Sequence, residues 1–279
     1  MLAEWLEFAF LRRALAAGLL VALAAGLLSP FIVLRRMAFA GHGLAHAAFG
    51  GAALFLLLGG GVVAGGSLFA LLLAVLLAFW TRRGRISEDS AIGIIVPGAM
   101  AIGVIALALR KTYTQDLFGF LFGNILSVLP GDLAYVGAVT AAVVVAMIAF
   151  SRGFVSTTFH EELARVEGWP VDRLRGLFLV LVAGVVVASM KIVGIVLVSA
   201  LLVVPGATAL LFARSFAGVR IASIAIGIGS VLVGMFLSVV IDLPSGAVIA
   251  LVLVVAYAIG RILEAVLAGR AGGAARSTG

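Results

Sequence analysis

Two histidines four residues apart are the side chains of this sequence best suited to chemistry. His42 and His46 lie in AFAGHGLAHAAFGG, where every other residue is apolar or glycine. A spacing of four places both imidazoles on one face of a helix, one turn apart, which suits a borderline dication such as Zn²⁺. Hydrogen bonding between packed helices is the alternative role. The glycines at 41, 43, 50 and 51 are expected to keep that face open.

The composition indicates that helices crossing a membrane must position this pair. The chain has 64% hydrophobic and 11% charged residues, whereas soluble domains carry about 25% charged residues. Its apolar runs are about twenty residues long, the length of a membrane-spanning helix, and the short alternating segments of a barrel are absent. The sequence therefore predicts an all-α, polytopic membrane bundle of eight or nine transmembrane helices.

The apolar runs divide the chain between charged residues and Gly/Pro punctuation. Nine candidate spans cover residues 14–34, 42–58, 67–80, 91–109, 133–150, 177–190, 193–213, 221–240 and 245–262. The segment 112–129 is less apolar and reads as a half-helix or interfacial hairpin, so eight full spans is the alternative. Residues 1–269 are expected to form a single transmembrane domain, and the small, polar tail 270–279 a disordered cytoplasmic end. Pro97 and Pro205 interrupt apolar runs, and kinks are expected there.

The basic residues predict the orientation. They form short clusters between apolar runs and no basic stripe with interleaved aromatics, which argues against a nucleic-acid partner despite the net charge of +7. Lysine and arginine are retained in short cytoplasmic loops. If the loop 151–175 is cytoplasmic, most of the nineteen basic residues lie inside. The C-terminus is then cytoplasmic, and with nine spans the N-terminus lies outside.

Residues 154–170 form the one substantial polar insertion between spans. Ser156, Thr157 or Thr158 is expected to cap a short amphipathic cytoplasmic helix that ends at Gly168, just before Pro170. An ordinary connection needs only a few residues, so this helix reads as a docking element for a soluble partner, with a solvated connector as the alternative. The stretch HEELA lacks the second histidine of H-E-x-x-H, so it is no zinc-protease motif.

Several motifs, in order along nearly the whole chain, resemble those of one protein family. SPFIVLRRMAFAGHGLAHAAFGGAAL resembles the signature region of the permease subunits of bacterial ABC importers for zinc, manganese and related metals. The resemblance continues through EDSAIGI, LFGNIL, HEELARVEG, MKIVGIVLVSALLVVPGATA and DLPSGA. His46 falls on the family's histidine, whereas His42 and His160 each stand where the family usually has aspartate.

The resemblance implies a homodimeric permease of the bacterial cytoplasmic membrane that is itself no enzyme. Its expected partners are cytoplasmic ABC ATPase subunits and an extracytoplasmic metal-binding protein. The chain has no G-x-x-x-x-G-K-[ST] motif, so ATP chemistry needs another polypeptide. The residues expected to couple to the ATPase are His160, Glu161, Glu162, Leu163, Ala164, Arg165 and Gly168.

The resemblance also implies a transported dication and no permanently bound cofactor. His42, His46 and Asp242 are the expected metal residues, with Asp242 receiving the ion at the outer entrance or merely capping a helix. An imidazole in place of a carboxylate at position 42 removes a negative charge and favours Zn²⁺ over Mn²⁺. An ion-coupled secondary transporter is the alternative function, but such coupling normally needs carboxylates deep in the spans, and here nearly all lie at span edges or in loops.

Overall fold

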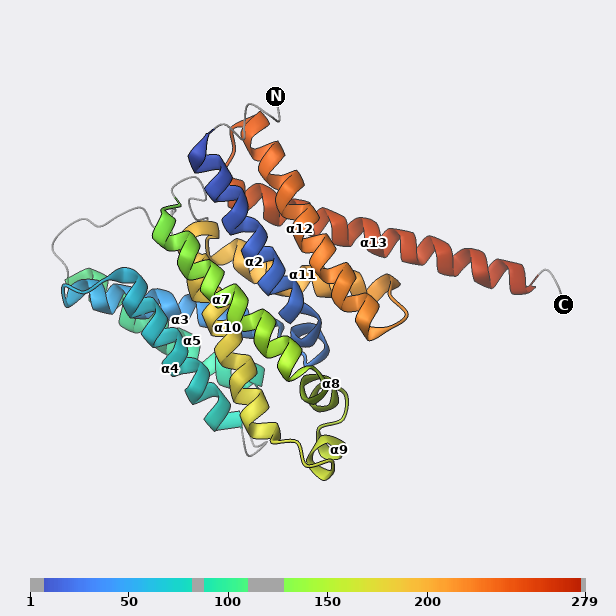
Figure 1. The fold of residues 1–279 in the computed structure, drawn as a ribbon, viewed down its shortest axis with the longest axis horizontal. Helices are drawn as coiled ribbons and strands as arrows, with labels where there is room; N and C mark the ends of the chain where they lie inside the picture. Colours follow the sequence, from blue (N-terminus) through green and yellow to red (C-terminus); the bar gives the residue numbers. More distant parts are fainter. Residues whose placement is uncertain (1–7, 82–87, 110–127, 277–279) are drawn as a thin grey trace.

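The computed structural model describes residues 8–81, 88–109 and 128–276, and every regular element in those ranges is a helix. Nine of these helices are long and apolar enough to cross a membrane. They are α2 (Ala9–Leu34), α3 (Ala38–Leu57), α4 (Val62–Thr81), α5 (Glu88–Leu109), α7 (Pro130–Ala149), α10 (Val171–Val193), α11 (Ile195–Phe212), α12 (Phe216–Ile241) and α13 (Ser245–Arg276). Two short helices, α8 (Ser151–Phe159) and α9 (Glu161–Val166), follow α7 at one end of the bundle (Figure 1).

The predicted all-α membrane bundle is confirmed, and each of the nine candidate spans corresponds to one helix. Most of segment 112–129 lies outside the described residues. Five helices begin four to six residues before the predicted spans. For example, α2 starts at Ala9 and includes Arg12 and Arg13. Arginine and alanine are good helix formers, so the charges that end an apolar run do not end the helix.

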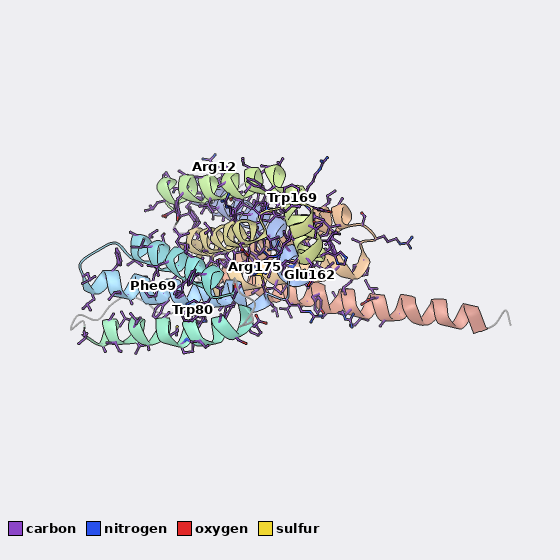
Figure 2. The ribbon with its side chains drawn as sticks, turned by 90° about the horizontal axis from the view of Figure 1, so that it is seen from below. Arg12, Phe69, Trp80, Glu162, Trp169 and Arg175 are labelled. Carbon is purple, nitrogen blue, oxygen red and sulfur yellow. The ribbon has the colours of Figure 1, made fainter. Side chains whose placement is uncertain are left out.

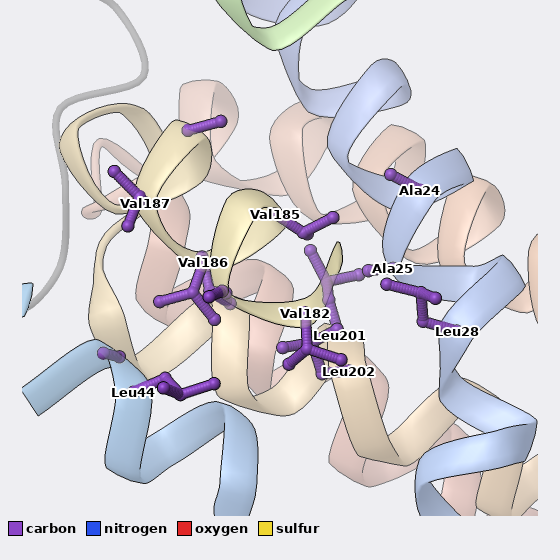
Figure 3. Packing of buried hydrophobic residues seen from close by; sticks show 14 of the residues in the cluster. Ala24, Ala25, Leu28, Leu44, Val182, Val185, Val186, Val187, Leu201 and Leu202 are labelled. Atoms are coloured by element: carbon purple, nitrogen blue, oxygen red, sulfur yellow. The ribbon is translucent and has the colours of Figure 1, made fainter. Parts of the chain in front are cut away.

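The centre of the bundle is built from α2, α10 and α11, with α3 packed beside them. Figure 3 shows Val182 and Val186 of α10 beside Leu201 and Leu202 of α11, and all four are at most 1% exposed. Figure 2, seen from below, places α7 and α5 at opposite edges of the bundle. The α5 helix has only 22% of its span buried, against 72% for α2, so large apolar side chains on α5 face outward, as lipid-facing or subunit-facing residues do.

Prolines inside the spans are accommodated by side chains of neighbouring helices. Pro30 in α2 cannot donate to the carbonyl of Gly26, four residues earlier. The Ser223 hydroxyl of α12 donates to that carbonyl at 2.8 Å. Helices α5 and α11 each continue through their proline, Pro97 and Pro205, without interruption. Beside Pro205, the Ser29 hydroxyl accepts from the Gly206 N–H at 2.8 Å.

The last helix is longer than a membrane span. With 32 residues, α13 is about 48 Å long, and Figure 1 shows its C-terminal part projecting away from the bundle. It continues to Arg276, within the tail 270–279 for which the sequence predicted disorder. Alanine and arginine favour extension of an existing helix, whose nucleation is already complete, while Gly272 and Gly273 oppose it by about 1 kcal/mol each.

Candidate functional site

The histidine pair lies near the start of α3. The connection of residues 35–37 separates α3 from α2, and His42 lies four residues into the helix. The Nε2 atoms of His42 and His46 are 3.0 Å apart, and the ring centroids are 4.3 Å apart at an interplanar angle of 74°. The predicted placement on one face is confirmed. One ring donates a hydrogen bond to the other, and a cation between the two lone pairs would replace that proton.

The pair faces away from the bundle of its own chain. His42 is exposed and His46 half-buried, and they share a stripe of α3 with the 63% exposed Phe39 and the half-buried Phe49. Residues on the other sides of α3 are buried. This stripe is therefore a surface that lipid, water or another polypeptide must cover.

The glycines around the histidines do not open the histidine face, so that expectation was wrong. They face other helices instead: a Cβ at Gly50 would lie 2.3 Å from the Ala99 carbonyl oxygen of α5. A Cβ at Gly51 would lie 2.1 Å from the Phe69 side chain of α4. Their absent side chains allow α3 to pack closely on α4 and α5, as small residues do between membrane helices.

Asp242 lies far from this pair. It is the exposed C-cap residue of α12, with a left-handed φ of 53°. Phe216 at the start of α12 packs on Phe31 near the end of α2, at a centroid distance of 5.0 Å, so α12 ends at the opposite end of the bundle. Within the described ranges, no three His, Cys, Asp or Glu side chains form a group able to hold a metal ion. The sequence could not show this separation, because it depends on how the helices pack.

The polar insertion folds as two short helices rather than the single one predicted over 154–170. Helix α8 ends at Phe159, and His160 (φ −145°, ψ 87°) turns the chain into α9 and is its N-cap. The predicted capping residues Ser156, Thr157 and Thr158 lie inside α8, where the Thr hydroxyls donate to carbonyls of their own helix and cap nothing. Helices α8 and α9 together are named the coupling segment.

The predicted stop at Gly168 is confirmed. Gly168 adopts a φ of 85°, which glycine tolerates without steric cost. The Trp169 N–H donates to the Ala164 carbonyl at 3.0 Å, and the Gly168 N–H donates to the Arg165 carbonyl at 3.1 Å. These two bonds form a Schellman motif that satisfies the last carbonyls of α9. Pro170 follows, and α10 begins at Val171.

Glu161 connects α9 to the bases of the spans. Its Oε1 accepts from Arg165 at 2.9 Å, and its Oε2 accepts from Arg175 of α10 at 2.6 Å. The hydrogen bond with Glu161 raises the pKa of Arg165, so that side chain stays charged at any physiological pH. Arg175 also donates to the Thr81 carbonyl, the last residue of α4, at 3.4 Å. Figure 2 shows Arg175 near Glu162 at this end of the molecule.

The outward side of α9 combines apolar and charged side chains. Leu163 is 52% and Val166 86% exposed, whereas Ala164 is fully buried against the bundle. Glu162 and His160 are also exposed. Contiguous exposed apolar residues outside the membrane spans mark contacts with another protein or with the membrane surface. The structure thus places the sequence-predicted coupling residues together on one projecting element.

Sequence reasoning missed Arg35, the C-cap residue of α2. Its guanidinium bonds to both threonines of α8 at 2.9 Å. In the sequence the basic pair Arg35 and Arg36 indicates orientation and forms part of the family signature, and nothing in a linear pattern connects Arg35 to hydroxyls more than a hundred residues away.

Comparisons with known proteins agree with this architecture. The profile described as "ABC 3 transport family" matches residues 7–264. The chain is 38% identical to a "Probable metal transport system membrane protein" of Thermotoga maritima over 91% of this chain and 90% of that one. It is 33% identical to the "Manganese transport system membrane protein MntC" of Halalkalibacterium halodurans, covering 89% and 85% of the two chains. It is 32% identical to the "High-affinity zinc uptake system membrane protein ZnuB" of Haemophilus influenzae, covering 86% and 92%.

A solved structure shares the fold. A chain of "PsaBC from Streptococcus pneumoniae in complex with Fab" superposes with a TM-score of 0.80 at 34% identity, covering 93% of this chain and 95% of that one. With its fold, its sequence profile and its curated relatives in agreement, this multi-pass membrane chain belongs to the ABC 3 transport family.

Proposed function

We propose that this chain is the membrane permease of an ATP-driven importer and that divalent metal ions pass along a path lined by His42 and His46. The observation that carries the proposal is the 3.0 Å approach of two imidazole nitrogens on the outward stripe of α3. Intramembrane ionisable residues typically mark transport paths. Relatives named as manganese and zinc transport proteins support the substrate class, and in this family the ATPase is a separate chain.

A second copy of the chain would complete the site. The pair supplies two nitrogens, whereas Zn²⁺ in proteins usually takes four ligands. If the outward stripes of two α3 helices face each other across a twofold axis, four imidazoles line one opening. The exposure of Phe39 and His42 fits a surface covered by such a partner.

The proposed cargo is Zn²⁺ in preference to Mn²⁺. Imidazole nitrogen suits zinc, while manganese prefers carboxylate and other oxygen ligands. No carboxylate joins the histidines within the described part of the chain to make a three-residue group. Because Asp242 lies exposed at the opposite end of the bundle, its proposed role is to receive the ion from an extracytoplasmic metal-binding protein.

Metal uptake by the reconstituted permease, ATPase and binding protein tests the path. Replacing both His42 and His46 by alanine is expected to abolish Zn²⁺ uptake into vesicles while dimer assembly, measured by native mass spectrometry, stays intact. Gly229→Ala, at a position with open space around its Cα, is the control and should transport normally. Unchanged uptake in the double variant would refute the path, and uptake without ATP would support an ion-coupled carrier instead.

The coupling residues are tested separately, through binding of the ATPase. Leu163 and Val166 are exposed, so Leu163→Asp with Val166→Asp should leave the chain's own packing intact. Charges at these positions are expected to prevent the ATPase from copurifying, because a buried unpaired carboxylate is costly in an interface. The conservative pair Leu163→Met with Val166→Leu is the control. A charged variant that still copurifies with the ATPase would contradict docking at α9.

A further inference from the structure

The inward side of the coupling segment holds the corner that leads into α3. We propose that Arg35 is a positioning residue that transmits movement of α8 to α3, and therefore to the histidine pair. This inference rests on the proposed function and adds to it the connection between the docking element and the metal path.

The guanidinium of Arg35 holds α8 through a fork of hydrogen bonds. Its Nε donates to Thr158 Oγ1 at 2.9 Å, and its Nη2 donates to Thr157 Oγ1 at 2.9 Å. Nη2 also lies 3.4 Å from the Phe154 carbonyl oxygen. Two donors on one rigid, planar group fix its orientation as well as its position.

Both threonine hydroxyls are oriented to accept from this fork. Thr158 donates its own proton to the Phe154 carbonyl at 2.6 Å, and Thr157 donates to the Gly153 carbonyl at 2.8 Å. Each hydroxyl has one proton and two lone pairs, so each presents a lone pair to Arg35. Each threonine hydroxyl therefore donates one hydrogen bond within α8 and accepts one from Arg35.

The guanidinium of Arg35 also packs against a cluster of buried aromatic rings beside α8. The Cζ of Arg35 lies 4.7 Å from the ring centroid of Phe178 in α10, within cation–π range. Phe178 packs on Phe154 of α8 and Phe31 of α2 at centroid distances of 6.1 and 6.2 Å. All three rings are fully buried. Arg35 is therefore held between α8 and α10 and cannot swing freely into solvent.

The corner that follows Arg35 is stiff. The Met37 N–H donates to the Ile32 carbonyl at 2.9 Å and the Arg36 N–H to the Val33 carbonyl at 3.0 Å, which is a Schellman motif. Arg36 adopts a φ of 58°, and Met37 is 1% exposed. Helix α3 begins at the next residue, and His42 lies about 6 Å further along its axis. A displacement of α8 that moves Arg35 is therefore expected to move the start of α3, and with it the histidines, by a similar amount.

Distance measurements between α8 and α3 test this connection. The chain has no cysteine, so Arg152→Cys on α8 and Leu58→Cys, at the 73% exposed C-cap residue of α3, accept spin labels outside the histidine stripe and need no other substitution. Diluting labelled chains with unlabelled ones gives complexes with one labelled copy. The label–label distance is measured by pulsed electron paramagnetic resonance, without nucleotide and with trapped ATP. The same complexes are assayed for ATP hydrolysis and for Zn²⁺ transported per ATP.

Two variants remove the hydrogen bonds between Arg35 and α8 from opposite sides. A third variant serves as the control, because it loses one positive charge without losing these bonds. Arg35→Gln removes the donors, and Thr157→Val with Thr158→Val removes the acceptors while keeping side-chain shape. Arg36→Gln is the control, because Arg36 is exposed and makes no side-chain hydrogen bond or ion pair within the described residues. In the unmodified chain and in Arg36→Gln, the α8–α3 distance is expected to stay narrow and unchanged when ATP is trapped.

In both fork variants the distance distribution is expected to broaden on ATP trapping. Basal ATP hydrolysis should persist while Zn²⁺ transported per ATP falls about tenfold, the scale expected for losing a charged hydrogen bond. Narrow distributions and an unchanged ratio in both variants, or an equal fall in Arg36→Gln, would overturn the proposal. Absence of Zn²⁺ uptake in the unmodified complex would count against the proposed function alone. The label–label distances would still test whether Arg35 couples α8 to α3.

Discussion

If His42 and His46 line the metal path as proposed, the charge at position 42 is expected to decide which cation they favour. We expect His42→Asp to raise Mn²⁺ uptake relative to Zn²⁺ by about tenfold, because a carboxylate supplies the hard oxygen ligand and negative charge that manganese prefers. Competition between the two ions in the reconstituted complex measures this ratio. His42→Asn is the control, since it supplies an oxygen without charge. An unchanged ratio in His42→Asp, or an equal shift in His42→Asn, would contradict the explanation.

Individual residues were predictable from the sequence where local geometry fixes them. The helical repeat alone places His42 and His46 one turn apart, and the structure confirms it. The position of Asp242 relative to that pair depends on the packing of α12 and was not predictable. Arg35 shows the same limit, because its hydroxyl partners are separated from it by 122 and 123 residues in sequence.

Helices followed from hydropathy more reliably than their ends did. Apolar runs of span length predicted all nine long helices of the described chain. The break at His160 was missed because two hydroxyls that fit a capping role instead bond within α8 and to Arg35. Gly168 was placed correctly, because glycine adopts a left-handed φ at the end of a helix at little cost and Pro170 disfavours continuation of the helix.

The crossing of α2 and α11 at Gly206 is a point where a helix contact determines stability. A Cβ at Gly206 would lie 2.6 Å from both the carbonyl carbon and Oγ of Ser29. We expect Gly206→Ala to destabilise the chain by about 1–3 kcal/mol, because overpacking forces the helices apart. It should also weaken the bond from the Gly206 N–H to Ser29. Thermal unfolding in detergent measures the effect.

Gly229 of α12 is the matched control for that substitution. No atom lies within 4 Å of a Cβ built there, so Gly229→Ala keeps the packing and gains up to about 1 kcal/mol of helix propensity. The melting temperature should therefore fall for Gly206→Ala and stay equal or rise for Gly229→Ala. Equal falls in melting temperature in both variants would show that the close approach of α2 and α11 does not determine the stability of the chain.

On the scale of the whole molecule, one end of the bundle gathers the coupling segment, the end of α2 and the base of α4. Arg35 and Arg175 connect these parts through bonds to Thr157, Thr158, Glu161 and Thr81. The histidine pair lies just inside this end, while Asp242 lies at the other. This polarity fits a permease that takes its ion from one side and is driven from the other.

The sidedness of this polarity follows from the basic residues and is open to a direct test. Because the chain has no cysteine, single cysteines report their own accessibility. Leu243→Cys, after eight spans, should react with a membrane-impermeant maleimide in intact cells, since Leu243 is 52% exposed at the predicted outer end. Arg214→Cys, exposed between α11 and α12, should react only after permeabilisation. Ala183→Cys, fully buried in α10, should stay unlabelled in both. Labelling of Arg214→Cys in intact cells would show that the predicted orientation is reversed. The exposed face of α9 would then lie outside the cell, where no cytoplasmic ATPase can reach it.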